Sequence, residues 1–239
     1  MLRLSFSLSS RPSRFPLSLH LHSHRLTMSS DSTLFEPITV GDLRLSHRIV
    51  MAPLTRFRAD AQHVHQPVAA EYYSQRASTP GTLLITEATF IDPKASGYAN
   101  VPGIWNDEQV QGWKRVVEAV HAKGCKIFLQ LWALGRAADA DNLREETGED
   151  VQSASDIAFE GGATPRPLTK DEIKVRSSPL SSLTPSSPDS QPLAQDYVSY
   201  YARAAKKFVE EAGGDGCEVH NANGTLLSLS QPLCGCSAS

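Results

Sequence analysis

Four short apolar runs recur along this chain of 239 residues, and each has the length of a β-strand. Segments with helical patterns separate them. Strands that alternate with helices predict a parallel sheet built of βαβ units. Because the runs are apolar on both faces, they fit a barrel and a doubly wound sheet equally well. The four runs are residues 48–53, 82–86, 126–132 and 217–219.

The segments between these runs carry recognisable start and stop signals. The best patterned helix is expected to begin at a cap on Asn106 or Asp107 and to stop at Gly124. The connection over residues 133–174 is polar and too long for an ordinary βα loop, which usually marks a functional excursion. Further helices are expected at 66–78 and 196–213, and a short hairpin at 38–45.

The composition excludes several classes of protein. A formal net charge of −3 provides no basic field for a nucleic-acid partner. No apolar run approaches the roughly 18 residues of a membrane span. The four cysteines show no metal-ligand spacing and no dense framework, so a reducing compartment is expected. We therefore expect one large domain, or part of one, that binds neither nucleic acid nor membranes.

Residues 1–27 differ in composition from the rest of the chain. They are rich in serine, carry four arginines and contain no acidic residue, which is the pattern of a mitochondrial transit peptide. Pro12 and Pro16 disfavour the amphipathic helix that such a peptide forms. The alternative is a start at Met28, which opens a plausible cytoplasmic sequence. We favour Met28 and a cytoplasmic location, with 1–27 a foreign, disordered segment.

The last strand-like run ends in polar residues. His220 and Asn223 follow residues 217–219 and are three residues apart. In a parallel α/β barrel, polar groups at the carboxyl ends of strands face the active site. A neutral imidazole and a carboxamide held side by side can donate two hydrogen bonds to one oxygen, as polarising a carbonyl requires. For this segment alone, an ordinary polar turn after a strand is the alternative.

Four fragments, each at the end of an expected strand, together resemble the old yellow enzyme family of FMN-dependent ene reductases. This family includes oxophytodienoate reductases and fungal NADPH dehydrogenases. The resemblance covers residues 34–224 except 175–195, and it implies an α/β fold, a TIM (β/α)8 barrel with FMN at its carboxyl mouth. A dihydroorotate dehydrogenase is disfavoured, because the histidine–asparagine pair and LQLW belong together in ene reductases. The fragments are RIVMAPLTR (48–56), TEATF (86–90), LQLW (129–132) and EVHNANG (218–224).

The resemblance implies roles for residues around the flavin ring. Pro53, Leu54 and Thr55 would lie against the ring, and the Thr55 hydroxyl would hydrogen-bond a flavin carbonyl and tune its electronics. Without the surrounding motif, Thr55 would be interpreted as a helix cap. Ala88 would let the backbone approach the ring closely. The amide of Gln130 would meet the pyrimidine edge, which needs both a donor and an acceptor.

The resemblance also implies a substrate site and a reaction. Trp132 would wall the pocket, although a tryptophan after a strand is more often a core residue. His220, which also contacts the flavin, and Asn223 would bind the carbonyl oxygen of an α,β-unsaturated carbonyl compound. NADPH or NADH would reduce FMN, and hydride would then pass to the β-carbon of this enone. The family commonly takes the final proton from a tyrosine, and this chain has Thr225 at that position.

The expected strands number half those of a complete barrel. A TIM barrel takes roughly 250 residues and eight strands, whereas this chain offers an incomplete barrel of about four βα units. The resemblance implies that the FMN phosphate site lies in the later strands. The alternative function is therefore a truncated, catalytically inactive fragment of such an enzyme, or a half barrel that persists as a homo-oligomer.

Two segments do not fit the barrel half expected at 32–224. Residues 175–195 are rich in serine and proline and interrupt a helix just after a capping box at Thr169 and Glu172, so we expect a disordered insertion. Residues 225–239 match nothing in the family and are interpreted as an aberrant tail. We interpret both segments as translated intron sequence, because removing 175–195 restores one unbroken amphipathic helix.

Overall fold

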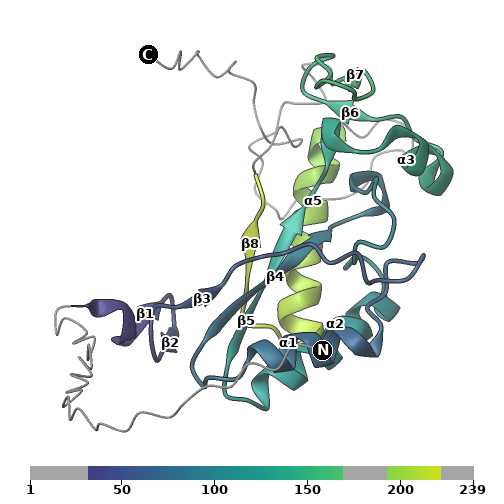
Figure 1. Ribbon diagram of the computed structural model, residues 1–239. Helices are drawn as coiled ribbons and strands as arrows, with labels where there is room; N and C mark the ends of the chain where they lie inside the picture. Colours follow the sequence, from purple (N-terminus) through teal and green to yellow (C-terminus); the bar gives the residue numbers. More distant parts are fainter. Residues whose placement is uncertain (1–31, 169–192, 222–239) are drawn as a thin grey trace, which may run out of the picture. The chain divides into compact units, whose positions relative to one another are not determined.

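The computed structural model describes residues 32–168 and 193–221, and its centre is a parallel sheet with the strand order β3-β4-β5-β8 (Figure 1). Every neighbouring pair in this sheet is parallel. The spatial order follows the chain order, as in a barrel, and does not reverse as it does in a doubly wound sheet. The strands are β3 (Val50–Met51), β4 (Leu83–Phe90), β5 (Lys126–Trp132) and β8 (Gly216–Val219).

A helix lies in each crossover between consecutive strands of the sheet. The helix before β5 starts as the sequence predicts, with a capping box in which Asn106 and Gln109 each bond the other's backbone N–H. The helix before β8 continues into a π-helix. The helices are α1 (Pro67–Arg76), α2 (Asp107–His121) and α5 (Leu193–Lys206), and the π-helix is η5 (Lys207–Glu211).

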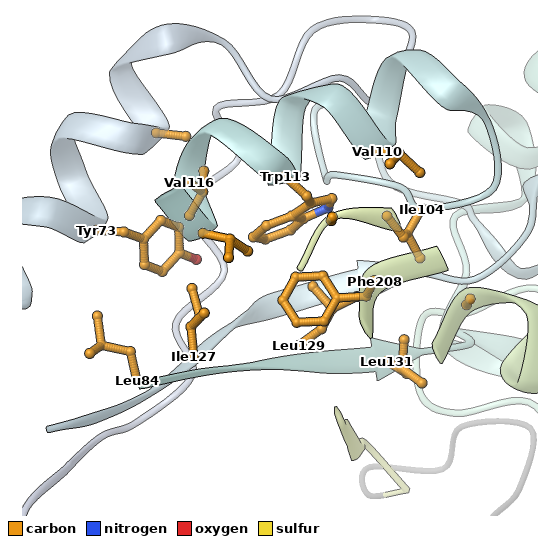
Figure 2. Packing of buried hydrophobic residues seen from close by; sticks show 14 of the residues in the cluster. Tyr73, Leu84, Ile104, Val110, Trp113, Val116, Ile127, Leu129, Leu131 and Phe208 are labelled. Atoms are coloured by element: carbon orange, nitrogen blue, oxygen red, sulfur yellow. The ribbon is translucent and has the colours of Figure 1, made fainter. Parts of the chain in front are cut away.

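The helices and one face of the sheet enclose a core of buried apolar side chains (Figure 2). Ile127, Leu129 and Leu131 point from β5 into this core. Because successive side chains on a strand point to opposite faces, Gln130 and Trp132 lie on the other face, which is the interior of a barrel. The remaining large members of the core come from each layer and include Tyr73, Leu84, Trp113 and Phe208.

Strand β4 is longer than the sequence predicts. The apolar run at 82–86 indicates an end near Glu87, but the strand continues to Phe90. A β-bulge shifts its register against β5 between Ile85 and Ala88. The bulge lets β4 pass through the buried polar residues Thr86 and Glu87 and then resume its pairing. The apolar run could not reveal this, because the extension begins with the polar residue Glu87 and then alternates apolar and polar residues.

Strand β3 is shorter than the apolar run at 48–53 indicates, since only Val50 and Met51 pair with β4. The predicted hairpin at 38–45 is confirmed as an antiparallel pair. Its strands are β1 (Ile38–Val40) and β2 (Leu43–Leu45), and the short 3-10 helix η1 (Thr33–Phe35) precedes them.

The predicted excursion after β5 contains short elements packed around a second buried cluster. This cluster includes Phe90, Val101, Leu134, Leu143 and Val151. The excursion therefore covers the carboxyl end of β4 with its own small core. Its elements are η3 (Gly135–Ala137), α3 (Ala140–Thr147), β6 (Gln152–Ser153) and β7 (Arg166–Pro167), and η2 (Pro93–Ala95) lies after β4.

Helix α5 begins at Leu193, three residues before the predicted resumption at Asp196. Leucine, alanine and glutamine favour helices and can extend one toward its amino end. The rest of the expected insertion, the capping box at Thr169 and the tail at 225–239 lie outside the described residues. The domain boundaries therefore stay a prediction. Within the described part of the chain, the helices are too short or too polar to cross a bilayer.

Candidate active site

The carboxyl ends of the four parallel strands carry most of the predicted site residues (Figure 1). Residues 53–55 follow β3, and Ala88 lies in β4 just beyond the bulge. Gln130 and Trp132 belong to the last part of β5, and His220 follows β8 directly. Residues that are far apart in the sequence therefore meet at one edge of the sheet.

The pairing of β4, β5 and β8 places two of these residues, Ala88 and Gln130, in one row with Glu218. Ala88 pairs with Gln130, and Gln130 pairs with Glu218. Beyond this row, the backbone N–H of His220 donates to the carbonyl oxygen of Leu131 at 2.9 Å. Strand register thus brings a small residue, an amide and an imidazole to one surface.

Gln130 is buried and is held by one hydrogen bond from its side chain and one from its backbone. Its Nε2 donates to Glu218 Oε1 at 2.6 Å. Its backbone N–H donates to Thr86 Oγ1 at 3.0 Å, in the place where the bulge interrupts the ladder. The second N–H and the carbonyl oxygen of the amide are thereby directed for use by a further donor and acceptor.

Trp132 joins β5 to the residues around it through ring contacts. It stacks on Phe90, with ring centroids 5.6 Å apart, and lies 5.4 Å from the His220 ring and 6.0 Å from Tyr98. Its indole N–H is buried and has no hydrogen-bond partner among the described residues. The structure therefore places Trp132 beside His220, while Asn223 lies outside the described residues.

The segment after β3 exposes apolar surface in a strained backbone. Leu54 is 56% exposed and Phe57 is 51% exposed, and Thr55 between them is half-buried. Phe57 has a φ of 53°, a left-handed conformation that is rare for a bulky residue and recurs at functional sites. Its ring lies 6.4 Å from that of Tyr98. Sequence reasoning missed Phe57 and Tyr98, because neither the backbone angle nor this contact leaves a mark in the pattern.

A buried carboxylate lies directly beneath this segment. Glu87 is 2% exposed, and burial raises its pKa to about 7 even though the backbone N–H of Arg56 and the Tyr73 hydroxyl hydrogen-bond it. Burial likewise lowers the pKa of the neighbouring His65 to about 3. Burying an ionised carboxylate without a paired cation costs several kcal/mol. Strongly shifted pKa values of this kind concentrate at functional sites, and sequence reasoning did not single out Glu87.

These residues fit the isoalloxazine ring of a flavin. Leu54 offers an exposed apolar surface and Ala88 adds no bulk beside the strand. The Thr55 hydroxyl and the Gln130 amide supply the donors and acceptors that a pyrimidine edge requires. The buried, unpaired N–H of Trp132 is a further group that a ligand can satisfy.

Several known proteins are similar to this chain over most of its length. Residues 33–230 match the model of the NADH:flavin oxidoreductase / NADH oxidase family. The chain is 48% identical over 205 residues to an Aspergillus flavus protein named NADP-dependent oxidoreductase lnbE, covering 85% of this chain and 48% of that protein. It is 46% identical over 198 residues to the probable inactive reductase easA of Epichloe festucae var. lolii, covering 83% and 47%. The chain thus spans about half the length of the curated relatives it matches.

A solved structure shows the same relation. The old yellow enzyme of Pichia sp. AKU4542 superposes with a TM-score of 0.68 at 38% identity, covering 82% of this chain and 47% of that one. The resemblance to old yellow enzymes is confirmed, and so is the expectation of a TIM-type barrel represented by about half of its βα units.

Proposed function

Since the chain belongs to the NADH:flavin oxidoreductase / NADH oxidase family, we propose that it serves the FMN-dependent reduction of α,β-unsaturated carbonyl compounds. Membership of this family confirms two expectations: the flavin is FMN, and a nicotinamide nucleotide is the reductant. The observation that carries the proposal is that Ala88 and Gln130 pair in register while His220, bonded to the backbone of Leu131, lies at the same edge of the sheet with Trp132 beside its imidazole.

The residues divide into a ring-binding group and a substrate-binding group. Residues 53–55, Ala88 and Gln130 hold the flavin ring, and His220 lies at the boundary between the ring and the substrate. Trp132 contacts Tyr98, and Tyr98 contacts Phe57, so the three rings form an aromatic wall beside the substrate. When bound, FMN supplies the hydride that the nicotinamide has delivered.

His220 and Asn223 address the carbonyl oxygen of the substrate. As hydride arrives at the β-carbon, negative charge develops on that oxygen, and an N–H donor aimed at it stabilises the charge by about 3 kcal/mol. A proton must then reach the α-carbon. Thr225 occupies the position from which the family commonly delivers it, and its alcohol is a far weaker acid than a phenol. Proton delivery by solvent is the simplest consequence.

The second candidate function is a catalytically inactive fragment of such an enzyme. One observation favours it: one of the relatives that the chain matches is named as a probable inactive reductase. The ring contacts alone lack the backbone amides and helix N-termini that normally hold a phosphate. FMN bound to the 239-residue chain should therefore be weak.

The two functions separate in one measurement on purified protein. The chain is saturated with FMN and its oxidation of NADPH is followed with and without an enone such as cyclohexenone. Turnover that depends on the enone supports the reductase. Absence of flavin binding and of turnover supports the inactive fragment. FMN that stays stoichiometric through gel filtration contradicts weak binding.

The proposal also covers the binding partners of the chain and its location in the cell. The partner is a small-molecule enone, and a second copy of the chain is the assembly to test by light scattering, because it could complete the half barrel. The location is the cytoplasm, and a transit peptide in residues 1–27 would instead direct a fluorescent fusion to mitochondria.

A further inference from the structure

The β-bulge of β4 sits between two of the flavin-binding segments. Ile85 pairs with Phe128 and Ala88 pairs with Gln130, so three steps along β4 match two along β5. Thr86 fills the gap by accepting the backbone N–H of Gln130. The bulge therefore sets the position of Gln130 on one side of β4, and Glu87 points toward the other side.

Glu87 reaches from the bulge into the space between β4 and α1. Its Oε2 accepts the backbone N–H of Arg56 at 2.9 Å. Its Oε1 lies 3.4 Å from the Tyr73 hydroxyl, and the backbone N–H of Glu87 donates to that hydroxyl at 2.9 Å. The same Oε1 is 3.6 Å from His65 Nε2, which is also buried. The two carboxylate oxygens thus have different partners: Oε1 lies near Tyr73 and His65, and Oε2 accepts from the segment after β3.

We propose that Glu87 is a positioning residue that holds residues 53–55 in the place where they meet the flavin, by binding the backbone N–H of Arg56. The inference rests on the proposed function. Among the described residues, the segment's short β3 strand provides little other support, because only Val50 and Met51 pair with β4. Residues 52–58 form no regular secondary structure. The hydrogen bond to Glu87 therefore acts one residue after Thr55.

The side chain of Arg56 provides a second attachment to α1. Its guanidinium lies 5.3 Å from the centroid of the Tyr72 ring, and the Arg76 guanidinium lies 3.5 Å from the same centroid. Tyr72 in turn contacts Tyr73 edge to face. This attachment is exposed to solvent and the one to Glu87 is buried, so the carboxylate is the stronger of the two anchors.

A purely structural role would be served equally well by an apolar side chain. Glu87 lies where β4 faces α1, and the other residue that β4 contributes to this core is Leu84. An apolar residue would pack there without the desolvation of a carboxylate. What an apolar residue cannot do is accept the N–H of Arg56, and this is the interaction that the positioning role requires.

Three variants test the inference in the full 239-residue chain. Glu87→Ala removes the acceptor. Glu87→Gln keeps a carbonyl oxygen for Arg56 and offers an N–H to His65. Asp215→Asn is the matched control, because Asp215 also accepts a backbone N–H across the sheet, from Ile127 at 2.9 Å, but at the amino edge. Thermal unfolding of each variant establishes that it folds.

Two readouts are measured, amide hydrogen exchange at Arg56 without flavin and the FMN dissociation constant from flavin fluorescence. Glu87→Ala should lower the protection factor of Arg56 about tenfold and raise the FMN dissociation constant by a similar factor. Glu87→Gln should restore both, and Asp215→Asn should change neither. Unchanged protection in Glu87→Ala, or equal flavin loss in Asp215→Asn, would overturn the inference. If the unaltered chain binds no FMN, the proposed function fails, and the exchange at Arg56 alone decides whether Glu87 holds the segment.

Discussion

The loops at the two edges of the sheet differ in which residue types take left-handed backbone conformations. At the amino edge, Gly81, Gly124 and Gly213 take left-handed conformations shortly before β4, β5 and β8. At the carboxyl edge, Gly97 and Gly135 also have positive φ, but Phe57 and Asn100 share this conformation, and among the described residues every non-glycine with positive φ lies in a βα loop. Glycine relieves strain at no steric cost, whereas a side chain in this conformation retains it. The amino edge is thus built for stability and the carboxyl edge for presenting side chains.

Two buried carboxylates repeat this contrast. Asp215, before β8, accepts the backbone N–H of Ile127 and bonds Lys126 Nζ at 2.8 Å and His121 Nε2 at 2.7 Å. Although burial alone would raise it, these bonds lower the pKa of Asp215 below its ordinary value. Glu87 also accepts a backbone N–H, but its nearest basic partner in the described part of the chain is His65, whose pKa is lowered to about 3, and burial raises the pKa of Glu87. The charge of Asp215 is therefore stabilised in the folded protein, whereas burial makes the charged form of Glu87 unfavourable.

The largest expected effect is at His220. His220→Ala should slow enone reduction about 10²–10³-fold, because it removes a donor aimed at the oxygen where charge develops. Reduction of the flavin by NADPH should fall much less, since no charge develops on that oxygen in that half-reaction. Stopped-flow traces of the two half-reactions measure the difference. Asp215→Asn serves as the control at the other edge, and equal losses in both half-reactions would argue against the role of His220.

The pH dependence of stability should separate the two carboxylates. Glu87 has a folded pKa of about 7 against an ordinary value of 4.5, so its neutral form favours folding. Its contribution is fully present below about pH 4.5 and is lost as pH rises through 7, a change on the order of 3 kcal/mol. His65, whose pKa is lowered, contributes the opposite slope in every variant.

Urea unfolding of Glu87→Gln and the unaltered chain from pH 4 to 8 isolates the Glu87 contribution, because the His65 slope cancels in their difference. The unfolding free energy of Glu87→Gln relative to the unaltered chain should grow between pH 4.5 and 7. A difference that stays constant across this range would show that Glu87 is not titrating in the folded protein.

At the amino edge, the contribution of Asp215 to stability depends on pH in the opposite direction. The lowered pKa of Asp215 means that its contribution is present above the ordinary value of 3.8 and is lost as pH falls through the folded value. Asp215→Ala should cost about 2 kcal/mol at pH 7, because it leaves the N–H of Ile127, Lys126 Nζ and His121 Nε2 without their acceptor. Chemical denaturation measures the loss, which should become smaller in strong acid, where Asp215 is neutral but can still accept the N–H of Ile127. A larger effect on FMN binding than on unfolding would break the distinction between the two edges.

Features that depend on local sequence could be predicted, and features that depend on tertiary pairing could not. The limits of β5 follow from one continuous apolar run, and the start of α2 follows from the local pair Asn106 and Gln109. The placement of Gln130, Trp132 and His220 at one edge follows from parallel topology alone. By contrast, the bulge depends on how β4 pairs with β5, and the partners of Glu87 lie 14 and 31 residues away. Such features arise from tertiary pairing and leave no local pattern.

The smallest expected effect is on the strained backbone of Phe57. In Phe57→Gly, release of the left-handed strain gains about 1–2 kcal/mol, while the added freedom of glycine in the unfolded chain and the lost contact with Tyr98 offset most of it. The unfolding free energy should therefore change by less than about 1 kcal/mol. Removal of the aromatic surface should nevertheless raise the KM for an enone severalfold.

Gly124→Ala is the matched control at the amino edge. Its new Cβ would meet Pro80 at 3.5 Å, an ordinary contact, so the substitution tests only the left-handed conformation, at a φ of 72°. It should destabilise the protein by about 1–2 kcal/mol and leave the KM unchanged. The two variants should have opposite effects. Phe57→Gly should weaken enone binding with little change in stability, and Gly124→Ala should lower stability with no change in enone binding. If Phe57→Gly destabilised as much as Gly124→Ala and left the KM unchanged, Phe57 would be a structural residue, and the strain at the carboxyl edge would have no functional cause.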